Sequence, residues 1–331
     1  MADYLYESAR VRVLETRLLG REGIETLLGA KDLADAVSRL ADLGITPVTD
    51  AEGRFLREET LSRLLRDAYA ELSDVMEKDL ALALWRYPYD CNNVKAAIKG
   101  RIRGIDPRSM LFDFGTFDVD TVLKMVETED FSALPDHMRA AAVDALDAYA
   151  KSKNPQAIDL ILDSACYADM RAAAARSGVE AASRLVRLRI DLCNLLTVVR
   201  ILRMERSGDT GRQLLEAALI EGGTLSIETL TEWFEGGEEL LWERLYYTPL
   251  SGISVELSRG ERTLTDVERS LDNYQTYVLR EAKYAAFGAE VLIAYLVAVE
   301  YEVRNLRILL AGKSVGLDAA TIRERIRDAY V

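Results

Sequence analysis

Histidine, cysteine and proline are scarce in this chain, and each shortage narrows the chemistry that the chain can perform. The 331 residues include one His, three Cys and six Pro. The single imidazole, His137, and the widely spaced Cys91, Cys166 and Cys193 indicate neither a zinc site nor a thiol–imidazole pair. An odd number of cysteines without close pairs also argues against a disulfide framework. We expect no catalytic, cofactor-binding or metal-binding residues, and a reducing compartment.

Long apolar runs and an excess of positive charge are missing as well. The most apolar stretch, 285–299, contains Glu290 and is shorter than the roughly 20 residues that span a bilayer. The first residues lack the basic and apolar regions of a signal peptide. A formal charge of -13 repels phosphate backbones and argues against nucleic-acid binding. We therefore expect any association with a membrane to come through partners.

Alternating strand patterns are absent too, and helical spacing takes their place. Apolar residues recur at intervals of three and four in 61–75, 158–165 and 185–196. This pattern predicts an all-α fold. We expect the helix that opens near Leu61 to run on toward Trp85 and to end before Pro88.

One short pattern recurs in each third of the chain. An acidic residue precedes an asparagine by three positions, and apolar residues follow, in the pairs Asp90 and Asn93, Asp191 and Asn194, and Glu302 and Asn305. The regular interval predicts three similar helical units, approximately 1–114, 115–222 and 223–331, which can exchange terminal helices. A second parallel, between 115–123 and 223–231, predicts helix N-caps at Asp118 and Ser226.

The apolar neighbours predict that each repeated asparagine is buried. On a helix the acid lies one turn before the amide, so we expect it to orient the amide while the amide's other groups reach a neighbouring helix. The predicted role of all six residues is helix packing within each unit. The alternative is a ligand site formed by three amides that converge on an axis.

Basic side chains follow the repeated helices and are candidates for a partner interface: Lys95, Lys99, Arg101, Arg200, Arg203, Arg307 and Lys313. The alternative interpretation is a set of solvated helix faces with intrachain ion pairs. Residues 311–314 resemble the end of a phosphate-binding loop, but Arg307 stands where the first glycine of that motif belongs. We predict instead that a helix ends near Gly312, with Lys313 close to its negative end.

The order of these features resembles the C subunit of archaeal-type and bacterial V-type rotary ATPases, whose eukaryotic counterpart is the d subunit. The resemblance depends on residues 4–12 with Leu18 and Leu19, on 90–95, on 189–194 with Arg200, and on 295–331. It implies an all-α fold of three similar helical subdomains in a pseudo-threefold, funnel-like arrangement. It also implies a non-catalytic rotor subunit without cofactors, on the cytoplasmic face of the membrane rotor ring, which receives the central-stalk subunits D and F and serves ion transport.

Two other functions compete with this one. The repeats alone would suit a helical-repeat scaffold that binds other protein partners, although an interval near one hundred residues is longer than common solenoid units. The scattered acids could also serve an α-helical enzyme, which a perturbed carboxylate pair in a deep pocket would indicate.

Overall fold

The computed structural model describes residues 4–204, 209–258 and 262–331, and it confirms the prediction of an all-α fold. Within these ranges no strand forms, and the only β contact is an isolated bridge between Thr49 and Phe55. The chain divides into two compact units, Asp74–Leu245 and the combination of Met1–Ser73 with Tyr246–Val331. The division into three repeats remains a prediction.

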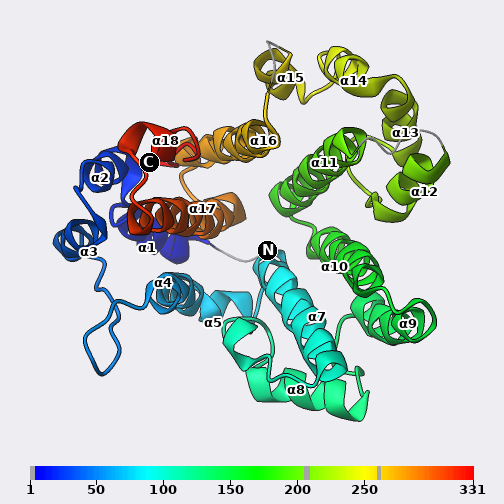
Figure 1. Ribbon diagram of the computed structural model, residues 1–331, viewed down its shortest axis with the longest axis horizontal. Coiled ribbons are helices and arrows are strands. Elements are labelled where there is room, and N and C mark those ends of the chain that lie inside the picture. Colours follow the sequence, from blue (N-terminus) through cyan, green and yellow to red (C-terminus); the bar gives the residue numbers. More distant parts are fainter. Residues whose placement is uncertain (1–3, 205–208, 259–261) are drawn as a thin grey trace. The chain divides into compact units, whose positions relative to one another are not determined.

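The unit that combines both ends of the chain is built around the long helix α17 (Ala289–Ser314) (Figure 1). Every residue from Ala289 to Val299 other than Glu290 is buried, because other helices contact α17 around its circumference. These are α1 (Leu5–Glu15), α2 (Gly20–Leu28), α3 (Leu33–Asp42), α4 (Arg57–Glu71), α16 (Leu264–Leu279), η3 (Arg280–Tyr284) and α18 (Ala319–Arg323). The short α15 (Ser251–Leu257) packs on α16. The apolar segment found in the sequence is therefore the core of this unit.

The other unit is organised around α10 (Pro155–Ser177), which contacts its neighbours on several sides (Figure 1). They are α6 (Leu80–Ala83), η1 (Leu84–Arg86), α7 (Tyr87–Arg103), α9 (Asp136–Ser152), α11 (Glu180–Arg203) and α12 (Asp209–Ala218). Helix α8 (Val119–Thr128) packs on α7, and α13 (Ile227–Glu235) and α14 (Gly237–Leu245) pack on α11. The remaining short elements are α5 (Ser73–Met76) and η2 (Arg108–Met110).

The helix boundaries confirm some predictions and correct one. Asp118 and Ser226 cap α8 and α13 by accepting the backbone N–H groups of Thr121 and Thr229. The predicted continuous helix from Leu61 toward Trp85 is wrong, because α4 ends at Glu71 and shorter elements follow. Pro88 stands in the first turn of α7, where its missing N–H has no helical partner to lose, so it helps to begin a helix.

Candidate functional site

Each repeated asparagine fixes the main chain of a segment that follows its helix. The Asn93 amide donates to the carbonyl oxygen of Phe112 over 2.7 Å and accepts the N–H of the same residue over 2.8 Å. Asn194 forms the same pair of bonds with Ile220, at 2.8 and 2.9 Å, and Asn305 forms it with Arg327, at 3.0 and 2.8 Å. All three asparagines are buried. Each side-chain amide thus acts as an additional peptide group, which satisfies both polar groups of one returning residue.

The acids of the first two copies hold a second point on the same returning segments. Oδ1 of Asp90 accepts the N–H groups of Thr116, at 2.8 Å, and Phe117, at 3.3 Å. The carboxylate of Asp191 accepts those of Thr224 and Leu225, each at 3.0 Å. The acid and the asparagine therefore have separate main-chain partners. These separate partners differ from the expectation that the acid orients the amide. The returning segment is irregular and has no helical hydrogen bonds of its own, so both side chains serve to fix it.

Glycines permit this close approach. A side chain at Gly115 would overlap Oδ1 of Asp90, and one at Gly223 would overlap Oδ1 of Asp191. The sequence parallel between 115–123 and 223–231 thus reflects a shared local structure. In each copy a loop contacts a carboxylate directly, and an N-capped helix follows.

The third acid has a partner from a distant part of the chain. Oε2 of Glu302 accepts the N–H of Leu19 over 2.6 Å, and the two residues are 283 positions apart. Leu19 directly precedes α2, just as the residues held by the first two acids directly precede α8 and α13. The acid–asparagine pairs therefore share one function in local structure, but the third pair joins two segments far apart in sequence.

Burial sets the protonation of these acids. It raises the pKa of Asp90 to about 6 and that of Glu302 to about 7, while the N–H bonds that they accept act in the opposite direction. Burial also raises the pKa of Asp191, against the N–H groups of Leu225 and Thr224. Oδ2 of Asp90 is buried without a hydrogen-bond partner, so the ionised form is poorly solvated.

The predicted interface cations make intrachain contacts. Lys95 and Lys99 of α7 pair with Asp163 and Asp159 of α10 at 2.6 and 2.5 Å. The others contact as follows: Arg101 with Glu129 and the Val126 carbonyl, Arg203 with Glu238, and Arg307 with Glu58. Arg200 is exposed near the end of α11 and also interacts within the chain. Intrachain contacts of this kind are what the alternative interpretation expects, and a partner-facing role stays a prediction for the whole set of cations, of which Arg101, Arg200 and Arg307 are exposed.

Lys313 is buried. Its ammonium group donates to the carbonyl oxygens of Leu28, over 2.7 Å, and Ala30, over 2.5 Å, at the C-terminal end of α2. Helix α17 continues to Ser314, so the Gly-Lys-Ser sequence ends a helix, as predicted. The positive charge lies at the negative end of a different helix from the one expected, and it fixes α2 against α17.

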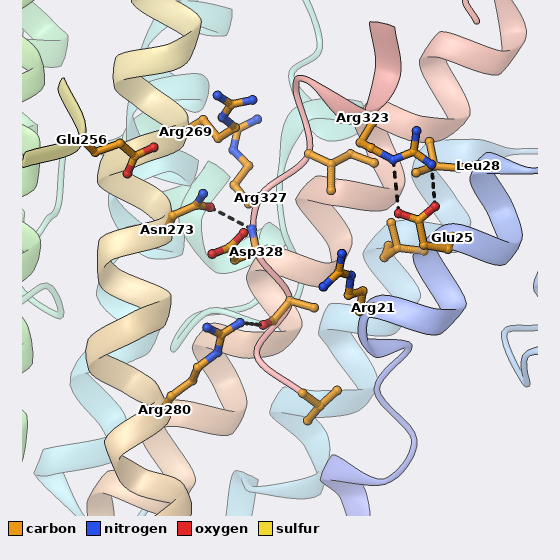
Figure 2. A pocket seen from close by; sticks show the side chains of 14 residues that line it. Arg21, Glu25, Leu28, Glu256, Arg269, Asn273, Arg280, Arg323, Arg327 and Asp328 are labelled. Carbon is orange, nitrogen blue, oxygen red and sulfur yellow. Dashed lines mark hydrogen bonds and ion pairs between the residues drawn. The ribbon is translucent and has the colours of Figure 1, made fainter. Parts of the chain in front are cut away.

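A charged cleft of about 570 Å³ lies between α2, α16 and the segment that follows α18. Figure 2 shows Arg323 paired with Glu25, with N–O distances of 3.2 and 2.5 Å, and the Arg21 side chain extending toward the cleft. Arg269 and Arg280 donate to the carbonyl oxygens of Glu324 and Ala329, and Asn273 accepts the N–H of Asp328 over 2.8 Å. The side chains of α16 and η3 therefore hold the main chain of the last residues.

Sequence reasoning missed two surface features, a charged cleft and a pair of exposed aromatic side chains. The cleft combines residues from both ends of the chain, which no local pattern brings together. Aromatic side chains are also exposed near the junction of η3 and α17, where Tyr284, the last residue of η3, is 93% exposed and Phe287 is 55% exposed.

The single histidine of the chain has a structural partner. The ring Nδ1 of His137 lies 2.8 Å from Oδ1 of Asp169, and the buried Asp169 carboxylate also accepts the N–H groups of His137 and Met138. Asp169 thus satisfies the first turn of α9. Among the described residues no group of three or more His, Cys, Asp or Glu is arranged to hold a metal ion.

None of the helices within the described ranges is long and apolar enough to cross a membrane.

Comparison with known proteins gives one consistent result. A family described as "ATP synthase (C/AC39) subunit" matches residues 8–325. The C subunit of the V-type sodium ATPase of Enterococcus hirae is 24% identical over 250 residues, 75% of each chain. The C subunit of the A-type ATP synthase of Methanococcoides burtonii is 24% identical over 98% of this chain and 94% of its own. The C subunit of the V-type ATP synthase of Thermus thermophilus is 24% identical over 98% of each chain. The chain therefore belongs to the ATP synthase (C/AC39) subunit family.

Proposed function

We propose that this chain is a non-catalytic central-stalk subunit of an A-type or V-type rotary ATPase. In this role it couples the central-stalk subunits D and F to the membrane rotor ring, on the cytoplasmic face of the membrane. The observation that carries the proposal is the family match over residues 8–325, with relatives named as C subunits that align over nearly the whole chain.

The local structure suits a part that transmits force. Each Asn side chain fixes one returning residue at both its N–H and its carbonyl, and Asp90 and Asp191 each fix a second point on the same segment. Irregular segments are thereby tied to the long helices α7, α11 and α17, so they resist local opening. Three similar subdomains, near 1–114, 115–222 and 223–331, in a pseudo-threefold funnel would give a stiff socket for a stalk.

The interface would use exposed charged groups. Arg200 of α11 is exposed and therefore suitable for a test, whereas Lys313 is buried and Lys95, Lys99 and Arg203 are partly covered by their ion pairs. Polar interfaces of this kind form and dissociate more readily than apolar ones.

Native mass spectrometry of the chain mixed with subunits D and F of the same organism tests the proposal. We expect a complex with one copy of each, and weaker binding by Arg200→Glu than by the control Arg187→Glu, which changes an exposed arginine of the same helix. Absence of a complex at low salt, with a folded D–F pair, would contradict the proposal and favour a scaffold for other proteins. Equal binding by the two variants would contradict the role of Arg200 alone.

A further inference from the structure

The acids of the repeat show a regular relation between long helices and the short helices that follow. Asp90 of α7 holds Thr116 and Phe117, just before α8, and Asp191 of α11 holds Thr224 and Leu225, just before α13. In both cases the chain itself also connects the long helix to the short one. Each of these contacts therefore reinforces a covalent link.

The third long helix has no such covalent link to the helix that it holds. Glu302 of α17 binds the N–H of Leu19, just before α2, and α2 packs on α17 as α8 packs on α7. The arrangement of long and short helices is thus cyclic. The Glu302 contact joins α17 to α2, as the chain itself joins α7 to α8. The N-terminal helix α2 belongs with the third repeat by this criterion.

The contact of Glu302 is also sparser than its two counterparts. Asp90 and Asp191 each accept two N–H groups, whereas Glu302 accepts one. Glu302 is half-buried and lines a cleft of about 610 Å³ together with Leu19 and Gly23. A small displacement of the segment before α2 would therefore admit water to this carboxyl group.

The ionisable groups around Glu302 are mostly acidic or phenolic. The larger cleft contains Arg17, which follows α1, Glu22 of α2, Asp67 and Glu71 of α4, and Tyr295 of α17. A smaller pocket that Glu302 also lines contains Tyr301, Asp328 and Tyr330. Glu71 pairs with Arg10. Among the described residues that line these two cavities, Arg17 is the one cation, so little positive charge is available to stabilise an ionised Glu302.

We propose that Glu302 is a proton-dependent clasp, which holds the start of α2 on α17 when its carboxyl group is protonated and releases it more readily when the group is ionised. The clasp acts within the unit that combines both ends of the chain, and it does not depend on which partners the protein binds.

The direction of the pH effect follows from linkage. Burial raises the pKa of Glu302 from 4.5 to about 7, against the opposing effect of the Leu19 N–H. Opening hydrates the carboxyl group and returns its pKa toward the ordinary value, so the open state binds fewer protons. Opening therefore becomes more favourable as the pH rises between these two values. Across pH 6 to 8 the fraction open should increase about tenfold.

Amide hydrogen exchange of the whole chain, corrected for the intrinsic effect of pH on exchange, measures this opening. We expect the segment 18–28 to lose about tenfold protection between pH 6 and pH 8 in the wild-type protein. Glu302→Gln keeps an acceptor oxygen without ionising, so its exchange should be independent of pH. Glu22→Gln, on an exposed acid of the same cleft, should retain the wild-type trend.

Two results would overturn the clasp. One is a wild-type segment whose corrected exchange does not change between pH 6 and pH 8. The other is an equal change in Glu302→Gln and the wild type. If Glu302→Gln does not fold, carbon-13 NMR titration of the Glu302 carboxyl in the wild type replaces it. A midpoint near 7 that coincides with the exchange transition supports the clasp, and a midpoint below about 5 contradicts it.

Discussion

Gly223 lies so close to the carboxylate of Asp191 that no side chain fits between them. The backbone of Gly223 does not have the positive φ that favours glycine, so space alone requires glycine here. The close approach lets Asp191 accept the N–H groups of Thr224 and Leu225. The glycine and the carboxylate therefore form one structural element, which Gly115 and Asp90 repeat.

Gly223→Ala should lower the free energy of unfolding by about 2 kcal/mol, because the added methyl group must displace the Asp191 carboxylate from its two N–H partners. Urea unfolding followed by circular dichroism measures the change. Gly29→Ala is the matched control, since a Cβ there meets only ordinary contacts of 3.5 Å or more. An equal loss of stability in the two variants would show that the close approach to Asp191 is unimportant.

The sequence was sufficient for features that depend on local patterns. Helical spacing predicted the all-α fold, and the Asp118 and Ser226 caps lie at their expected positions. The acid–asparagine pattern also marked α7, α11 and α17 as equivalent. Each of these features is encoded within a few turns of one helix, where spacing fixes which side chains share a face.

The partners of the repeated residues could not be predicted in the same way. Asn93, Asn194 and Asn305 bind segments 19, 26 and 22 residues later, and Glu302 binds a residue 283 positions earlier. These contacts depend on how irregular segments return, which follows from tertiary packing. The same limit explains why Lys313 was assigned to the end of its own helix, although it binds the end of α2.

Asn93→Ala should destabilise the protein by about 2 kcal/mol, because it leaves the N–H and carbonyl of Phe112 without their partners. The neighbouring Asn92 is half-buried on the same helix and forms no such pair of bonds. Asn92→Ala changes helix propensity by the same amount, so the difference between the two variants isolates the bonds to Phe112. Thermal unfolding of both proteins is the measurement, and similar midpoints would refute the role given to Asn93.

Lys313→Met should cost about 2 kcal/mol, because the carbonyl oxygens of Leu28 and Ala30 lose a charged donor in a buried site. Lys99→Met removes a lysine whose ion pair with Asp159 is partly exposed, so we expect a loss below about 1 kcal/mol. Denaturant titration of both variants gives the comparison. A larger loss for Lys99→Met would mean that the α7–α10 ion pair contributes more than the cap on α2.

The buried Asp90 should make stability fall as the pH rises. Its pKa is raised from 3.8 to about 6, so the folded protein binds a proton that the unfolded chain releases between these values. The stabilisation from this proton is fully present below pH 3.8 and is lost as the pH rises through about 6, with a total near 3 kcal/mol, or about 1.4 kcal/mol for each pH unit.

Asp90→Asn removes this titration while retaining an oxygen that can accept the N–H of Thr116. We expect the difference in unfolding free energy between wild type and Asp90→Asn to change with pH from about 4 to about 6.5, in the direction that disfavours the wild type at the higher pH. Asp144→Asn, on an exposed acid of α9, should follow the wild-type profile. Parallel profiles for wild type and Asp90→Asn would show that Asp90 is ionised throughout this range, which would require an unseen partner for its buried Oδ2.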